Sequence, residues 1–294
     1  MEREHGVDEK VDVTKMIDIL IMGSSRPKLL PYCINSIREK VKYSGNFRWL
    51  YHEDFVYPKY SQESVNYLIS QNFDEVVSHY PAIGYGRAIE HMLDYIKSPF
   101  FLMIQEDCEF EREVDLDIVI NLMDKYNEIN QITYHINKTP RQFKGKGAIY
   151  NLKEYEFDNI TLTLWYAWLF FPNITRLDWF KKKWVVKPNE PEKFKPADWF
   201  TNEVLGNIQD RVKHEYSYNN IGSFIYGKIG EPRYVRHIGD SWRSPYWQLK
   251  RKDESRDFSG KEKPLEWHRQ NMHFDVKLHP RPSNEIKSGW YPER

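Results

Sequence analysis

Segments with the apolar pattern of strands alternate with helix-like segments between residues 16 and 104, and this alternation constrains the fold more than any other feature. Short apolar or alternating runs indicate strands, whereas apolar residues three and four positions apart indicate one face of a helix. Strands are predicted at 16–23, 47–55, 73–81 and 100–104, and helices at 28–43, 61–71 and 85–98. This order predicts an α/β fold with a mixed, mostly parallel sheet and helices on both faces.

Three of the predicted strands run directly into polar residues. The clusters are Gly23–Arg26, His52–Asp54 and Gln105–Glu109. In sheets of this kind, ligands bind at the carboxyl ends of the strands. One such cluster is ordinary for a surface loop, but three clusters at one edge of a sheet predict a binding site.

The second half of the chain has a weaker pattern. A helix is predicted at 114–129, strands at 131–137 and 159–172, and a helix at 198–212. The Gly- and Lys-rich stretch 138–157 is predicted to be a hairpin or a mobile loop. The last sixty residues or so show little periodicity, so an irregular C-terminal segment is expected.

Composition restricts the location and the partners. The two cysteines, Cys33 and Cys108, are too few for a disulfide framework, which favours a reducing compartment. No stretch reaches the roughly 18 to 20 apolar residues of a membrane span, so a cytoplasmic protein without a transmembrane segment is expected. The formal net charge is zero, yet residues 233–294 hold 14 Lys and Arg against 9 Asp and Glu. A basic segment rich in aromatic residues suits an anionic partner.

The common phosphate-binding loops are absent from the sequence. Neither GxxxxGK[ST] nor GxGxxG follows the first predicted strand, which removes the usual NTPase and dinucleotide-binding interpretations. A diphosphate would then need a metal bridge. The carboxylates after the strand at 100–104 supply the hard oxygen ligands that Mg²⁺ or Mn²⁺ prefers.

Four stretches together resemble the nucleotide-sugar-binding half of the family 2 (GT-A) glycosyltransferases. They are "MGSSRP", "HED", "GYGRAIEHM" and "FFLMIQEDCEF". The resemblance covers the chain up to about residue 115 and implies a GT-A-type, Rossmann-like sheet. It divides the chain into a polar lead (1–15), a donor-binding half (16–115), an acceptor half (116–232) and a basic, aromatic-rich C-terminal segment (233–294).

In that family a strand delivers an Asp-x-Asp type motif to the donor's ribose and metal-bound diphosphate. The matching residues here are Gln105, Glu106 and Asp107. The resemblance implies that Asp107 binds the metal and that Glu106 is an accessory acid. Gln105 departs from the usual acidic first position, so its ribose contact would be a neutral hydrogen bond. The alternative is a solvated strand end.

Further donor contacts are implied for the first loop, for an acid after the second strand and for the start of the third helix. The residues are Ser24, Ser25, Arg26, Glu53, Asp54 and Arg87. The loop would contact the nucleobase and ribose, one of the two acids the nucleobase, and Arg87 the diphosphate. The alternatives are a solvent-facing turn and an ion pair of Arg87 with Glu90 or Asp94.

Two anchors come from later in the chain. His237 is the candidate for a late metal ligand, with Arg243 beside it to neutralise the leaving diphosphate. Asp198 is the candidate base that deprotonates the acceptor hydroxyl, with Glu203 in reserve. A structural histidine and a helix N-cap at Asp198 are the alternatives.

The predicted function is therefore a Mn²⁺- or Mg²⁺-dependent inverting transfer of a sugar from a nucleotide donor to an acceptor hydroxyl. The acceptor would be an envelope glycan, or a hydroxymethylated base in phage DNA. The stretch "SWRSPYWQLKRK" (241–252) alternates rings and cations as a nucleic-acid surface does. A sugar-phosphate nucleotidyltransferase and a non-catalytic sugar-binding module are the alternatives.

Overall fold

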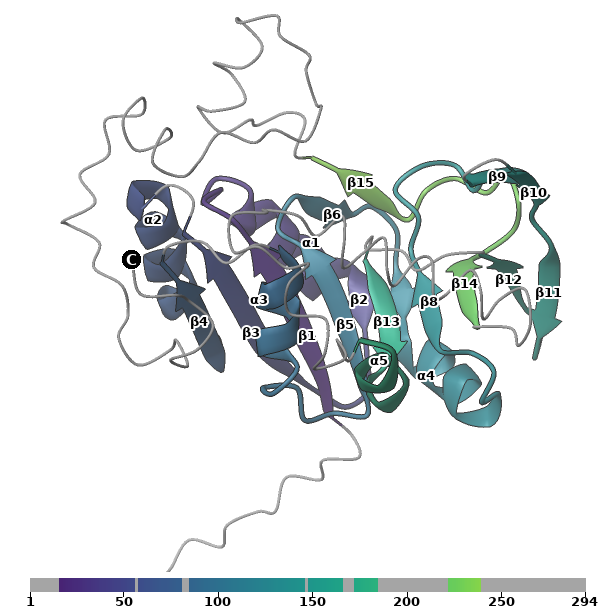
Figure 1. Cartoon of the computed structure of the whole chain (residues 1–294), viewed down its shortest axis with the longest axis horizontal. Helices are drawn as coiled ribbons and strands as arrows, with labels where there is room; N and C mark the ends of the chain where they lie inside the picture. Colours follow the sequence, from purple (N-terminus) through teal and green to yellow (C-terminus); the bar gives the residue numbers. More distant parts are fainter. Residues whose placement is uncertain are drawn as a thin grey trace, which may run out of the picture.

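A nine-stranded mixed sheet forms the centre of the computed structural model, which describes residues 16–55, 58–80, 85–145, 148–165, 172–184 and 222–238. The strand order is β11-β12-β14-β8-β13-β5-β1-β3-β4 (Figure 1). The strands are β1 (Met16–Gly23), β3 (Asn46–Asp54), β4 (Glu75–His79), β5 (Phe100–Gln105), β8 (Gln131–Thr133), β11 (Glu154–Phe157), β12 (Ile160–Leu164), β13 (Asn173–Arg176) and β14 (Ser223–Tyr226).

Strand direction follows from the pairing. The strands β4, β3, β1 and β5 are mutually parallel, and β14 is parallel to β8. Only β12 and β13 run against the other strands of this sheet. The predicted mixed, mostly parallel sheet is confirmed.

Helices cover both faces of the sheet, as predicted. They are α1 (Leu30–Lys40), α2 (Pro58–Ser70), α3 (Tyr85–Met92), α4 (Leu116–Lys125) and α5 (Leu177–Trp184). Alternate residues of a strand point to opposite faces. Accordingly, Ile17, Ile19 and Ile21 of β1 pack in the cluster that contains α1 and α4. Leu20 and Met22 pack in the cluster that contains α3 and α5.

Three short strand pairs complete the described fold. A hairpin joins β9 (Gln142–Gly145) to β10 (Ala148–Asn151), so the hairpin alternative for 138–157 is confirmed. The strand β6 (Cys108–Phe110) pairs with β15 (Val235–His237), and β2 (Val41–Lys42) pairs with β7 (Val114–Asp115). The β6–β15 pair joins two segments that are distant in the sequence, one directly after Asp107 and one that ends at His237.

Some boundaries differ from the predictions. The sequence pattern did not reveal β13, which inserts antiparallel between β5 and β8. The second helix begins at Pro58 rather than at Ser61, and the Ser61 hydroxyl donates to Glu53. The predicted helix at 198–212 and the C-terminal residues 239–294 lie outside the described residues.

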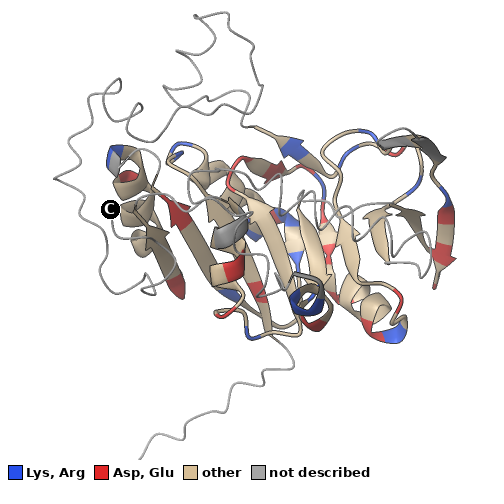
Figure 2. Cartoon of the chain, in the orientation of Figure 1, with Lys and Arg blue, Asp and Glu red and all other residues tan. Residues whose placement is uncertain are grey.

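Charge is unevenly distributed over the described ribbon. Figure 2 shows that most of the central strands are uncharged and that charged residues lie mainly at strand ends, on helices and in connections. Among the described residues, no helix is long and apolar enough to cross a membrane.

Candidate active site

The strand β1 ends in a glycine that lies against Tyr51 and Glu106. A Cβ atom at Gly23 would overlap the Tyr51 hydroxyl from β3 and the Glu106 carboxylate after β5. Only glycine, which has no side chain, permits this approach. Two residues later, Ser25 is buried and has a φ of 57°, a left-handed conformation that L-residues seldom adopt. The loop is therefore held in one unusual shape.

Buried carboxylates hold the backbone of this loop. The Ser24 amide donates to Glu106 Oε2 at 2.7 Å, and the Ser25 amide donates to Glu53 Oε1 at 2.6 Å. The Ser61 hydroxyl from α2 also donates to Glu53 Oε1, at 2.7 Å. The Tyr51 hydroxyl lies 2.6 Å from Glu53 Oε2 and 3.1 Å from Glu106 Oε2, so it links the two acids.

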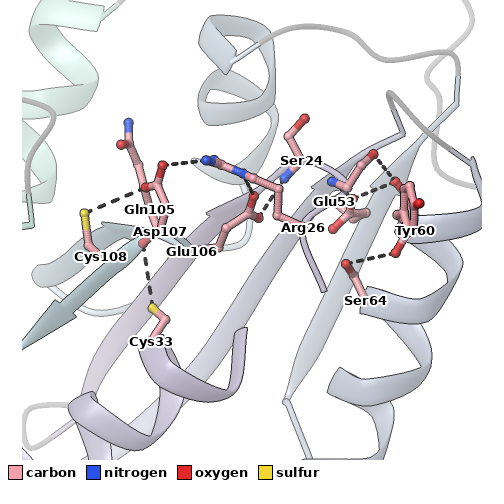
Figure 3. A network of polar contacts seen from close by, with 12 residues as sticks. Ser24, Arg26, Cys33, Glu53, Tyr60, Ser64, Gln105, Glu106, Asp107 and Cys108 are labelled. Carbon is pink, nitrogen blue, oxygen red and sulfur yellow. Dashed lines mark hydrogen bonds and ion pairs between the residues drawn. The ribbon is translucent and has the colours of Figure 1, made fainter. Parts of the chain in front are cut away.

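Arg26 completes the network from the end of the loop. Its Nε donates to Glu106 Oε1 and its Nη1 donates to Asp107 Oδ2, each at 2.5 Å (Figure 3). The Arg26 side chain is 25% exposed, whereas the side chains of Glu106 and Asp107 are 0% and 6% exposed. The guanidinium therefore lies between the buried acids and the solvent, at the carboxyl ends of β1 and β5.

The β6–β15 pair brings His237 to Asp107 across 130 residues of sequence. The register places His237 opposite Cys108, and the Ile238 amide donates to the Asp107 carbonyl at 2.7 Å. His237 Nε2 then lies 3.0 Å from Asp107 Oδ2, with 34% of the histidine side chain exposed. The two residues that the resemblance implies as metal ligands therefore lie next to each other, and their role stays a prediction.

The three acids of the network differ in their pKa values. Burial, followed by the neighbouring Glu106 carboxylate, raises the pKa of Glu53 from 4.5 to about 8. Burial also raises the pKa of Glu106, although Arg26 opposes the increase. For Asp107 burial acts in the same direction, but Arg26 and His237 outweigh it and hold the pKa of that carboxyl below its ordinary value. Near neutral pH, Glu53 is protonated and Asp107 is ionised.

The predicted site residues divide into three groups. One network contains Ser24, Ser25, Arg26, Glu53, Glu106, Asp107 and His237. Gln105 ends β5 beside the network, and Asp54 ends β3 on the face opposite Glu53. Arg87 lies in α3, and the structure describes only its backbone. Asp198, Glu203 and Arg243 lie outside the described residues.

Two residues of the network were not predicted. Tyr51 precedes Glu53 by two positions on β3 and therefore points to the same face of the sheet. This spacing could have indicated the contact between the two side chains. Ser61 donates to Glu53 from α2, and no sequence pattern indicated that contact. Glu109, the last residue of the cluster after β5, forms an ion pair with Arg236.

The hydrogen-bonded separation of Asp107 and His237 also matches the spacing of two ligands around one divalent ion. Two ligands at right angles, each with a bond of about 2.1 Å, lie about 3.0 Å apart. The measured separation of Asp107 Oδ2 and His237 Nε2 is 3.0 Å. Within the described ranges, no cluster of three or more His, Cys, Asp or Glu side chains could hold a metal ion. A metal here would need further ligands besides these two side chains.

No protein-family model matches the chain, and no curated protein is significantly similar to it in sequence. Among solved structures, GalNAc-T7 with UDP, GalNAc and Mn²⁺ has a TM-score of 0.52 at 10% identity and covers 92% of this chain. The fold is that of the GT-A glycosyltransferases.

Two other solved structures are similar at lower scores. They are residues 1–349 of TarS from S. aureus with UDP (TM-score 0.46, 11% identity, 75% of this chain) and the mannosyltransferase PcManGT from Pyrobaculum calidifontis with GDP-Man and Mn²⁺ (0.45, 8%, 84%). The aligned part spans 58% of the GalNAc-T7 chain, 60% of the TarS chain and 64% of the PcManGT chain. The predicted GT-A fold is confirmed, while membership of family 2 stays a prediction.

Proposed function

We propose that this chain is a metal-dependent glycosyltransferase that moves a sugar, with inversion, from a nucleoside-diphosphate donor to an acceptor hydroxyl. The observation that carries the proposal is the pairing of Asp107 and His237 at the carboxyl end of β5, 3.0 Å apart, on a GT-A fold. These two side chains would hold Mn²⁺ or Mg²⁺. Such an ion neutralises the negative charge that develops on a departing diphosphate.

The loop after β1 would form the wall of the donor site. Its backbone is fixed by Glu53 and Glu106, so these two acids position the loop and do not themselves contact the donor. Both carboxyl groups are fully buried, and both oxygens of Glu53 are hydrogen-bonded. Asp54 remains an acid proposed for the nucleobase, and Gln105 remains the residue proposed for the ribose.

The acceptor half supplies the proposed base. Asp198, with Glu203 in reserve, would take the proton from the acceptor hydroxyl as that oxygen attacks the anomeric carbon and the bond to the diphosphate breaks. Holding the two substrates in line supplies a large part of the rate enhancement in a reaction of this type. Arg87 and Arg243 are proposed to neutralise the diphosphate.

Two acceptor classes are proposed: an envelope glycan and a hydroxymethylated base in DNA. The basic, aromatic stretch 241–252 favours DNA. A nucleic-acid acceptor releases counterions on binding, so its affinity should fall steeply between 50 and 200 mM salt, by roughly 10³-fold or more. Affinity that does not change with salt would favour the glycan.

A thermal-shift panel of nucleotide sugars, with and without Mn²⁺, tests the proposal on the full chain. A specific donor stabilises the folded state by mass action and should raise the melting temperature only when Mn²⁺ is present. Nucleoside triphosphates in the same panel would identify a nucleotidyltransferase, and free sugars would identify a sugar-binding module.

The variant Asp107→Asn should abolish the Mn²⁺-dependent shift, sugar transfer and donor hydrolysis. Asp124→Asn, an exposed change on α4, is the matched control and should preserve all three. Near-normal, Mn²⁺-stimulated transfer by Asp107→Asn would show that the metal assignment is wrong.

A further inference from the structure

Arg26 occupies the position that a cation would take beside the two acids. Its guanidinium contacts Glu106 Oε1 and Asp107 Oδ2, both at 2.5 Å. Asp107 Oδ2 is also the atom that lies 3.0 Å from His237 Nε2. The oxygen best placed to bind a divalent ion therefore already carries a positive partner from the chain itself.

We propose that Arg26 is an internal counter-ion that keeps Asp107 closed to a free divalent ion. When a metal and a nucleotide arrive together, the guanidinium leaves Asp107 and binds the donor's diphosphate. This inference rests on the proposed function and deepens it, because it names what controls metal entry at the same site.

The charges favour this exchange. The guanidinium of Arg26 contacts one carboxylate oxygen of Glu106 and one of Asp107, at 2.5 Å each. A divalent ion arriving alone at Asp107 Oδ2 would be repelled by this positive charge. A diphosphate offers several anionic oxygens, and a guanidinium binds such groups through two parallel hydrogen bonds. Metal and nucleotide should consequently increase each other's affinity.

The structure lets the guanidinium move without unfolding the loop. The backbone around Arg26 is held independently, by the amides of Ser24 and Ser25 on the two buried glutamates. The Arg26 side chain is 25% exposed and therefore has a route toward solvent. Glu106 would keep its contacts with Ser24 and Tyr51 after the guanidinium leaves.

Calorimetric titration of the full-length chain and of Arg26→Met tests the proposal. Mn²⁺ alone should bind Arg26→Met roughly tenfold tighter than the unaltered chain, because the competing charge is gone. UDP or GDP in the presence of Mn²⁺ should bind the variant roughly tenfold more weakly, because the diphosphate has lost its bidentate partner. Arg38→Met is the matched control: this exposed arginine of α1 bonds Gln71, away from the site, and should change neither affinity.

The two affinities of Arg26→Met change in opposite directions only if Arg26 acts as a counter-ion. If Arg26 merely supports the loop, its replacement should weaken the affinity for Mn²⁺ alone and the affinity for the nucleotide together. That outcome, or an unchanged affinity for Mn²⁺ alone, would overturn the proposal. If Arg26→Met does not fold, Arg26→Lys replaces it, because lysine keeps the positive charge but cannot bond two acids at once. Arg26→Lys must then bind Mn²⁺ alone more tightly, and UDP or GDP with Mn²⁺ more weakly, than the unaltered chain, with smaller changes than those expected for Arg26→Met. Failure of UDP and GDP to bind the unaltered chain at any Mn²⁺ concentration would instead count against the proposed function, while the titration with Mn²⁺ alone would still judge Arg26.

Discussion

Replacing Glu53 by Gln should remove much of the pH dependence of folding stability in the neutral range. In the folded chain the pKa of Glu53 is about 8, compared with 4.5 for an ordinary glutamate. Between these values the folded state keeps a proton that the unfolded state has released. Stability therefore falls as pH rises through this window, by about 1.4 kcal/mol per pH unit. The whole window corresponds to a loss on the order of 5 kcal/mol.

A glutamine has the shape and hydrogen-bonding capacity of the protonated acid. Its carbonyl oxygen can accept from the Ser25 amide and the Ser61 hydroxyl, as Glu53 Oε1 does. Its NH₂ group can donate to the Tyr51 hydroxyl oxygen, which then donates its own proton to Glu106. The variant should therefore fold and should match the unaltered chain at pH 5 to within about 1 kcal/mol.

Urea unfolding between pH 5 and pH 8.5, followed by circular dichroism, measures the effect. The variant should become progressively more stable than the unaltered chain as pH rises, by several kcal/mol at pH 8. Glu63→Gln, on the exposed face of α2, is the control and should follow the unaltered chain at every pH. A stability difference between Glu53→Gln and the unaltered chain that stays constant from pH 5 to pH 8 would refute the reasoning.

Three further predictions concern the same site. Gly23→Ala should destabilise the fold by about 1–3 kcal/mol and weaken nucleotide binding, because its Cβ would displace Tyr51; Gly230→Ala, at a φ of 82° with more room, should cost about 1–2 kcal/mol and leave binding unchanged. If the two variants weaken binding equally in calorimetry, the loop does not shape the donor site. His237→Ala should lower the affinity for Mn²⁺-nucleotide roughly tenfold or more, and unchanged affinity would make this histidine structural. Asp198→Asn should slow transfer by roughly 10² or more while sparing donor affinity; an equal loss of donor binding and turnover would make Asp198 a structural residue instead.

The sequence alone was sufficient to predict the order of the strands and helices in the first half of the chain. Each of β1, β3, β4 and β5 is a short apolar or alternating run, and such periodicity is local information. The strand β13 was missed because its four residues follow a continuous apolar run, and only its partners β5 and β8 define it. Periodicity does not report such long-range pairing.

The sequence also determined which residue types gather at the edge of the sheet. Polar clusters after three parallel strands must meet at one edge, so the placement of Arg26, Glu53 and Asp107 near one another followed from topology. Similarity to a known family added His237, which lies 130 positions from Asp107, and the β6–β15 pair brings the two together.

Only the tertiary structure decided what each of these residues contacts. Glu53 and Glu106 look like ligand-binding acids in the sequence, but their oxygens are hydrogen-bonded to the loop of β1, to Tyr51 and to α2. Arg26 was expected to contact the donor or to lie in a solvent-facing turn, but its guanidinium forms ion pairs with two buried acids. Burial and partner distance set the charge and the role of an ionisable group, and both depend on residues far away in the chain.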